Sequence, residues 1–477
     1  MDVRTTPLTR LLAIASSLAL TAGLLSSCSS SVSPNSVTNV NAAAATVPVL
    51  ITDAPSDQLA AFTLTLNSIV LTDSAGKTAS ILPSAATVEI CHLNGIQAPL
   101  VTASIPQDTY VSALITFSNP QITYINSSGQ PVTVTPTLAT TSFTFSFPAP
   151  GFVVNNTSTS LLVDLLAGPS VAISGTTVTV TPTFSLKPIP PATAAPPPGQ
   201  NGTGMEQHGA VVSASGTTLV VEPPSGPNIT FTTNSSTIYQ GPGVTTLTSL
   251  TAGELVEVDF TVQTGGTFLA TRVEVEPPPP TGQPPINLLS GPVTSVGSGS
   301  FKMVLMQGLG PAVPVSATAV SLFTVTTNSS TVFAITPQFV SLTGLPFTPS
   351  FTSANLTAGQ SVGVVTSSIT GTTAVASNVY LIPETIGGTV TKIVSGTGYT
   401  AYTVTLNTGS AFSSLSGATT ITVYTSFATA VPPTTTGTAP PGIAVGGAVR
   451  FNGLIFNLGS GSFAMVADCS PDGTPGH

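Results

Sequence analysis

The hexapeptide TTNSST occurs twice in this chain, at residues 232–237 and again at residues 326–331. Each copy is followed by the tetrapeptide LTAG, at residues 250–253 and 356–359. Between and around these motifs, β-branched residues alternate with polar ones, which is typical of half-buried strands. Such self-similarity predicts tandem copies of one structural unit built from short strands.

Each copy opens with a Gly-x-Val stretch, at residues 209–211 and 291–293, and a third such stretch lies at 388–390. The third copy is degenerate, because residues 446–451 read GGAVRF where the second copy has GQSV at 359–362. About six short strands are expected in each copy. That number favours a small closed or nearly closed barrel, since a two-sheet sandwich of this size would bury little apolar surface.

The part of the chain before these copies also alternates, with turn residues between the runs, and predicts a β-sandwich. No window of helical periodicity is long enough to matter. About eight strands are expected there, at residues 47–52, 62–72, 88–93, 110–117, 131–135, 142–147, 159–165 and 176–186.

Only 5% of the 477 residues are charged, and 8 Lys and Arg against 17 Asp and Glu give a net charge of −9. Helical bundles and coiled coils carry several times that share of charge, so a mostly helical fold is not expected. The chain has no basic stripe with which to displace counterions from a phosphate backbone, which argues against nucleic acid as a partner.

The first 28 residues are organised as a secretory signal, with Arg4 and Arg10 before the apolar run 11–25. Residues 25–28, LSSC, resemble the bacterial lipobox, in which the cysteine is diacylated and becomes the mature N-terminus. We therefore expect lipid attachment at Cys28. The alternative is an ordinary signal peptide with an incidental cysteine.

A lipid on Cys28 would anchor the protein to a membrane without spanning it. Ser29 follows the cysteine where the inner-membrane retention signal has Asp, so the resemblance implies a cell-envelope protein at the outer membrane. The expected partners are this membrane and either a glycan or another envelope protein. Cys91 and Cys469 then remain, either as a disulfide or as two separate thiols.

Proline-rich stretches divide the chain. The predicted organisation is a signal peptide at 1–28, a tether at 29–46, a β-sandwich at 47–187, a linker at 188–207, a first barrel at 208–276, a linker at 277–287, a second barrel at 288–383, a third barrel at 384–469 and a tail at 470–477.

Residues 50–55 (LITDAP), 105–110 (IPQDTY) and 163–165 (VDL) resemble an N-terminal domain family of unknown function from secreted bacterial lipoproteins. Its signatures are of the (L)TDAP and (P)xGxY types. Residues 107–108 are Gln-Asp where a small residue or Gly is usual, so this turn is expected to differ.

Residues 250–258 (LTAGELVEV) and 270–275 (ATRVEV) resemble a second family of unknown function, with a Leu-x-x-Gly-x-x-Val-x-Val strand and a closing Ala-x-x-Val-x-Val strand. Together the two resemblances cover most of the mature chain. Neither family has an established activity, so they imply architecture rather than chemistry.

Two groups of carboxylates are candidate cation sites. Asp53, Asp57 and Asp164 belong to or adjoin the sandwich motifs, and carboxylates that meet at a strand end could hold Ca²⁺. The alternative is that they build turns by binding backbone N–H groups.

Glu257 and Asp259 alternate along one predicted strand, and we expect their carboxylates to share a face with Glu254 and with Glu274 and Glu276 of the neighbouring strand. Arg272 is the only cation nearby. The face is either simply solvated or binds a cation.

Tyr399 and Tyr402 are candidate ligand-binding residues, because sugars stack on aromatic rings and these two tyrosines lie close in sequence. The three histidines are scattered, and the chain has neither G-x-S-x-G nor H-E-x-x-H. We therefore expect no enzyme and no cofactor, but a structural, adhesive or ligand-presenting envelope protein; the alternative is a carbohydrate-binding lipoprotein.

Overall fold

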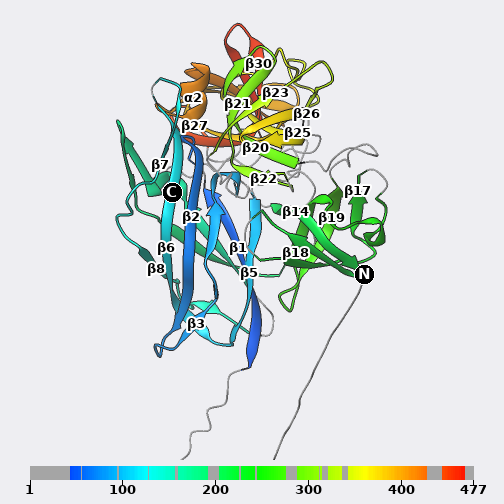
Figure 1. Ribbon diagram of the computed structural model, residues 1–477. Coiled ribbons are helices and arrows are strands. Elements are labelled where there is room, and N and C mark those ends of the chain that lie inside the picture. The colour runs from blue at the N-terminus through cyan, green and yellow to red at the C-terminus, as the bar shows by residue number, and fades with distance from the viewer. Residues whose placement is uncertain are drawn as a thin grey trace, which may run out of the picture. The chain divides into compact units, whose positions relative to one another are not determined.

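Strands make up nearly all of the regular structure, which confirms the all-β prediction (Figure 1). The computed structural model describes residues 43–467 except 55, 94–95, 127, 156–158, 192–203, 225–226, 242–243, 276–286, 311, 314–320, 336–341 and 427–442. Helical structure among these residues consists of α1 (Ala167–Ser170), α2 (Ala411–Ser416) and the 3-10 turns η1 (Cys91–Leu93) and η2 (Leu247–Ser249). None of the described helices has the length and apolar character that crossing a membrane requires.

The N-terminal part is a sandwich of two sheets. The first has the order β13 (Phe184–Ile189), β10 (Ser160–Leu166), β1 (Ala44–Ala54), β5 (Ile96–Pro106), and it continues from β5 into β14 (Gly204–Ser215) of the first barrel. Up to β14, the pairs β1–β10 and β5–β14 are parallel and the others are antiparallel. The second is built around the long antiparallel pair of β2 and β6, which run side by side in Figure 1. Their bounds are β1 (Ala44–Ala54), β2 (Leu59–Asp73), β3 (Thr78–Ser80), β4 (Ala86–Glu89), β5 (Ile96–Pro106), β6 (Thr109–Ile125), β7 (Pro131–Val134), β8 (Ser142–Ser146), β9 (Phe152–Val153), β10 (Ser160–Leu166) and β13 (Phe184–Ile189); β11 (Val171–Ser174) and β12 (Thr177–Val180) form a separate hairpin.

Side chains from both sheets fill one apolar core between them. Phe184 of the first sheet lies 5.8 Å, ring centre to ring centre, from Phe117 and 5.7 Å from Phe143 of the second. The sequence did not predict β5, which contains Pro99. This proline is tolerated because it lies where the register between β1 and β5 shifts.

Three five-stranded rings follow the sandwich, and all three have the same connectivity. In each, the first strand pairs with the second and the fourth, the second with the third, and the third with the fifth in parallel, while the fourth and fifth complete the ring. This is the connectivity of five-stranded Greek-key barrels of the OB type.

The barrel strands, in chain order, have the following bounds. The five ring strands of the first barrel are β14 (Gly204–Ser215), β15 (Thr218–Glu222), β16 (Ile229–Thr232), β18 (Leu255–Val262) and β19 (Phe268–Val275), and β17 (Ile238–Gln240) continues the third of them. Those of the second are β20 (Asn287–Gly297), β21 (Ser300–Val304), β23 (Leu322–Thr326), β25 (Ser361–Thr370) and β26 (Thr373–Leu381), where β24 (Val332–Ile335) continues the third and β22 (Gln307–Leu309) pairs with the first. Those of the third are β27 (Glu384–Ser395), β28 (Tyr399–Leu406), β29 (Thr420–Ser426), β30 (Ala448–Gly459) and β31 (Ser462–Ala467).

Strands extend into several segments predicted as linkers. β1 begins at Ala44, inside the predicted tether 29–46, and β14 begins at Gly204, inside the predicted linker 188–207. The central parts of both proline-rich linkers and the tail at 470–477 lie outside the described residues.

The glycine of the Leu-x-x-Gly turn, or Gly446 at the same place in the degenerate third copy, is bound to the valine of the Gly-x-Val stretch in the same barrel. In the first barrel the Gly253 N–H donates to the Val211 carbonyl at 2.8 Å, and the Val211 N–H donates to the Glu254 carbonyl at 2.8 Å. The same pair of bonds joins Gly359 to Val293 in the second barrel and Gly446 to Val390 in the third. A glycine is required in the turn because φ at Gly253 is +89°.

The glycine of the Gly-x-Val stretch has a different role, which is to allow close approach of the second strand. A Cβ at Gly209, Gly291 or Gly388 would lie 2.4, 1.8 or 2.2 Å from a carbonyl oxygen of that strand or its immediate continuation. No side chain fits there. The two repeated glycines therefore explain how three diverged copies keep one fold.

The TTNSST motif forms a bulge between the two halves of the third ring strand, β16 and β17 in the first barrel. Both halves pair with the fifth ring strand, β19. Between Thr232 and Ile238 the third strand advances six residues, while the fifth advances three, from Leu269 to Arg272. The Thr237 hydroxyl donates to the Ala270 carbonyl at 2.8 Å and accepts a bond from the Asn234 N–H at 3.0 Å.

The second TTNSST repeats these contacts. The Thr331 hydroxyl donates to the Ala376 carbonyl at 2.9 Å and accepts from the Asn328 N–H at 2.9 Å. Asparagine and threonine are suited to this turn because their short polar side chains bind nearby backbone groups.

Side chains fill the barrel interiors. In the first barrel, Phe231, Phe260 and Phe268 are buried, with ring centres 5.1 to 5.9 Å apart. In the third, Tyr402 packs on Phe451 at 5.5 Å. Small barrels packed in this way meet ligands on their outer surfaces and loops rather than inside.

Candidate functional site

Charged side chains form two rows across three neighbouring strands of the first barrel. In one row His208 of β14 pairs with Glu257 of β18, which pairs with Glu274 of β19. In the other, Glu206 pairs with Asp259, which pairs with Arg272. Alternate residues of a strand share a face, so all six side chains project from one side of the sheet. Val258 and Val273, between them in sequence, point into the barrel core.

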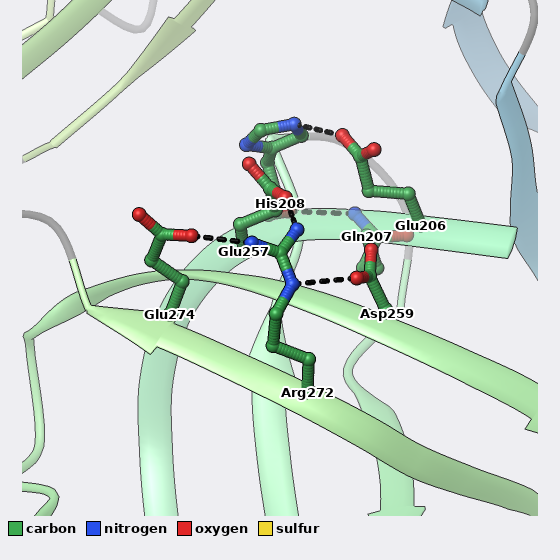
Figure 2. Close-up of polar contacts among 7 residues, drawn as sticks. All are labelled: Glu206, Gln207, His208, Glu257, Asp259, Arg272 and Glu274. Carbon is green, nitrogen blue, oxygen red and sulfur yellow. Dashed lines mark hydrogen bonds and ion pairs between the residues drawn. The ribbon is translucent and has the colours of Figure 1, made fainter. Parts of the chain in front are cut away.

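Arg272 holds three of the four carboxylates. Its Nε donates to Asp259 at 2.6 Å, its Nη1 to Glu274 at 2.5 Å, and its Nη2 to Glu257 (Figure 2). The Arg272 side chain is only 14% exposed, whereas those of Asp259 and Glu274 are 31% exposed. Directly opposed carboxylates repel, so this guanidinium is what allows Glu257 and Glu274 to face each other.

Glu206 and His208 form the second part of the cluster. His208 Nε2 lies 2.5 Å from Glu206 Oε1, and the Glu206 side chain is 10% exposed. Figure 2 shows the imidazole turned toward Glu206 on one side and lying above Glu257 on the other. One ligand atom each from Glu206, His208 and Glu257 lie within 4.8 Å of one another, and this is the only such triplet among the described residues.

The electrostatics of the cluster reflect its burial and its excess of negative charge. Burial and then the charge of Glu206 raise the pKa of Glu257 to about 8. Burial also raises the pKa of Asp259 above its usual value. For Glu206 burial acts in the same direction, but the His208 charge and hydrogen bond, with help from Arg272, outweigh it and lower the pKa.

The pKa of Arg272 is raised. Burial opposes its charge, but the hydrogen bond to Asp259 and the nearby carboxylates more than compensate. The guanidinium is therefore a fixed positive charge at every working pH, and the four carboxylates outnumber it.

The predicted sharing of one face by Glu257, Asp259 and Glu274 is what the structure contains. Glu254 is elsewhere, in the turn before β18, where its carboxylate accepts the Thr251 N–H at 2.8 Å. Glu276 lies outside the described residues.

Glu206 and His208 were not predicted as site residues, because residues 188–207 were assigned to a linker and His208 lay at its edge. The available signal was the alternation of these two polar residues directly before the Gly209 strand, which predicts one common face if the strand is extended backwards.

Asp53 and Asp164, predicted as possible ligands, lie on the neighbouring parallel strands β1 and β10. Asp53 is 5% exposed, and its Oδ1 accepts the Ala167 N–H at 3.3 Å, while its Oδ2 has no hydrogen-bond partner among the residues that the structure describes. Burial, followed by the charges of Asp164 and Glu89, raises the pKa of Asp53 well above its usual value.

Asp57 does not join Asp53 and Asp164. Its Oδ2 accepts bonds from the Gly387 N–H at 3.2 Å and from the Asn407 side-chain amide at 3.1 Å, both in the third barrel. This carboxylate binds neutral donors from a distant part of the chain, so among the described residues it is neither grouped with Asp53 and Asp164 nor bonded to the N–H groups of a local turn. Burial nevertheless raises its pKa.

The two predicted ligand-binding tyrosines lie apart. Tyr402 is fully buried in the third barrel, so it cannot contact a sugar, and that part of the prediction is wrong. Tyr399 is partly exposed and packs edge-on against Tyr424 at 5.4 Å. Phe347 extends this group, with its ring centre 5.5 Å from that of Tyr424.

Of the three cysteines, only Cys91 lies among the described residues, where it is a free thiol. Burial raises its pKa well above the usual value, with a further contribution from Glu89. Cys28, the predicted lipid site, and Cys469 both lie outside the described residues.

Comparison with known proteins places one segment of the chain. A family described as Domain of unknown function (DUF5666) matches residues 208–274. No curated protein matches the chain. The match runs from His208 in β14 to Glu274 in β19, and so includes every charged residue of the cluster except Glu206. The resemblance of the first barrel to a domain family of unknown function is therefore confirmed.

Proposed function

We propose that this protein is a lipid-anchored component of the bacterial cell envelope, held at the outer membrane, with a structural, adhesive or ligand-presenting role and no catalytic one. The observation that carries this proposal is the threefold repetition of one barrel behind a β-sandwich. Repeated rigid units suit a protein that displays surfaces at a distance from its anchor.

The packing of the barrels supports this role. Aromatic and aliphatic side chains fill each interior, so a partner has to meet the outer faces and loops. Nearly all of the outer surface depends on hydroxyls and amides for its solubility, because so few residues are charged. Such a surface keeps its character when the pH of the medium changes.

The anchor itself is proposed from the LSSC sequence at residues 25–28. The resemblance of the motifs at residues 50–55, 105–110 and 163–165 to a domain of secreted lipoproteins supports the same location in the cell envelope.

The anchor is tested by expressing the full chain in a Gram-negative host with radiolabelled palmitate and separating the membrane fractions. We expect labelled protein in the outer-membrane fraction and an unlabelled, unanchored product from Cys28→Ser. Cys91→Ser is the matched control, because it removes a cysteine that is not in a lipobox, and it should remain labelled. A mature N-terminus downstream of Cys28 would overturn the proposal.

Carbohydrate binding is a second candidate, favoured by the group of Tyr399, Tyr424 and Phe347, all of which are partly exposed. Sugars stack on such rings. Glycan-array binding that Tyr424→Ala abolishes and the buried-site control Tyr402→Phe preserves would support it. An array without hits would remove this candidate.

A further inference from the structure

We propose that the first barrel binds a divalent transition-metal ion of the zinc class through Glu206, His208 and Glu257. This inference concerns the outer face of the barrel and does not depend on the lipid anchor or on the role proposed above.

The geometry of the three side chains fits a small metal ion. Their ligand atoms lie within 4.8 Å of one another. Zinc is bound by imidazole nitrogen and carboxylate oxygen at about 2.0–2.2 Å, so ligand atoms around it are separated by about 3–4 Å. His208 Nε2 and Glu206 Oε1 lie 2.5 Å apart, so these two groups would have to separate by about 0.5–1.5 Å to hold the ion between them.

The sheet fixes the positions from which these side chains project. His208 and Glu257 are direct partners across β14 and β18, and Glu206 is two residues from His208 on the same face. Ligands carried by paired strands are held more firmly than ligands carried by loops. The Glu206 side chain is nine-tenths buried, so one ligand is already withdrawn from water and directed at the imidazole.

The surrounding charges favour a cation. Four carboxyl groups, those of Glu206, Glu257, Asp259 and Glu274, surround Arg272 and the imidazole of His208. A metal ion binds the neutral imidazole, so in the occupied site Arg272 is the one positive side chain that opposes them. Arg272 contacts Oε1 of Glu257, and the carboxylate has a second oxygen to offer a metal. A residue that hydrogen-bonds to a metal ligand orients that ligand, and mutation of such a residue commonly lowers metal affinity 10- to 100-fold.

The ligand set selects the class of metal. Calcium and magnesium prefer sites built of oxygen alone, whereas an imidazole nitrogen beside carboxylates suits zinc and the neighbouring divalent ions. The candidate ion is therefore zinc rather than the calcium that the acidic residues alone would indicate.

Titration calorimetry tests the proposal with ZnCl₂ and the tag-free mature chain, first treated with EDTA and then freed of it. We expect binding of one ion per chain at this site, with affinity at least tenfold weaker in His208→Gln and in Glu206→Gln. His92→Gln is the matched control, because His92 Nδ1 lies 3.1 Å from Glu89 without a third ligand among the described residues. Its zinc affinity should stay within twofold of the unmodified protein.

A second measurement does not depend on the folding of any variant. Co²⁺ replaces zinc in such sites, and its visible absorption should have the intensity of a four- or five-coordinate nitrogen and oxygen site. Absence of zinc binding, equal binding by folded His208→Gln, or tighter binding of CaCl₂ than of ZnCl₂ would each overturn the proposal.

Discussion

Replacing Arg272 by Met should destabilise the first barrel strongly. The substitution keeps most of the side-chain volume but removes the guanidinium that bonds Glu257, Asp259 and Glu274. Three carboxyl groups that the guanidinium now holds would then lie beside one another without it. Removing one partner of a buried ion pair costs about 3–5 kcal/mol, because it leaves uncompensated charge.

The exposure of the partners sets the expected value within that range. Arg272 is 14% exposed and Glu257 19%, but Asp259 and Glu274 are 31% exposed and partly screened by water. The lower end, about 3 kcal/mol, is therefore expected. In a domain of this size, about 1 kcal/mol corresponds to about 4–8 °C, so the barrel transition should fall by about 12–24 °C.

Differential scanning calorimetry of the mature chain at pH 7 in EDTA measures this shift. Lys302→Met is the matched control, because it removes an exposed positive charge from strand β21, and it should change stability by less than about 0.5 kcal/mol. Adding Asp259→Asn to Arg272→Met should restore about half of the loss, since it removes a charge that the Nε of Arg272 otherwise neutralises. A loss below about 1 kcal/mol without rescue would refute the view that Arg272 organises the cluster.

Three further changes test other parts of the structure. Asp53→Asn should stabilise the sandwich at pH 7 but not at pH 4 in thermal melts. The pKa of Asp53 is raised in the folded protein, so its stabilising contribution is fully present below the unfolded-state pKa and is lost as pH rises through the folded-state pKa. An asparagine cannot ionise and so avoids that loss. The exposed control Glu222→Gln should show no such difference, and an equal effect of Asp53→Asn at both pH values would contradict the reasoning. Thr237→Val should cost the first barrel about 1–3 kcal/mol in urea titrations because it removes both bonds of the bulge, and Thr237→Ser should recover most of that loss. Gly291→Ala should destabilise the second barrel by about 3 kcal/mol or more, whereas Gly371→Ala, in an open turn, should cost less than half as much; equal losses would exclude the close approach as the cause.

The local motifs predicted the architecture because each encodes a local constraint. The repeated glycines mark one turn and one close approach in each of the three copies, so these copies could be aligned before their fold was known. The TTNSST motif marks one bulge in the first two copies. The parallel pairing of third and fifth strands was not predicted, since nothing in either strand's own sequence specifies so distant a partner.

The candidate site was only half predicted. Glu257 and Asp259 were found because alternation along one strand is a local pattern. Glu206 and His208 were missed because the proline-rich stretch 188–207, whose last proline is Pro198, indicated a linker. Tyr399 and Tyr402 could have been separated in advance, because residues three apart on a strand lie on opposite faces.

Closure of the rings protects a chain of tandem, similar domains against aggregation. In each ring, every one of the five described strands has a hydrogen-bonded neighbour on both sides. Neighbouring domains of similar sequence tend to exchange strands and aggregate through open edges. A closed ring leaves no open strand edge, so it can be duplicated in tandem without that tendency to aggregate. Its copies can then differ in surface charge, and the first of them carries the charged cluster around Arg272.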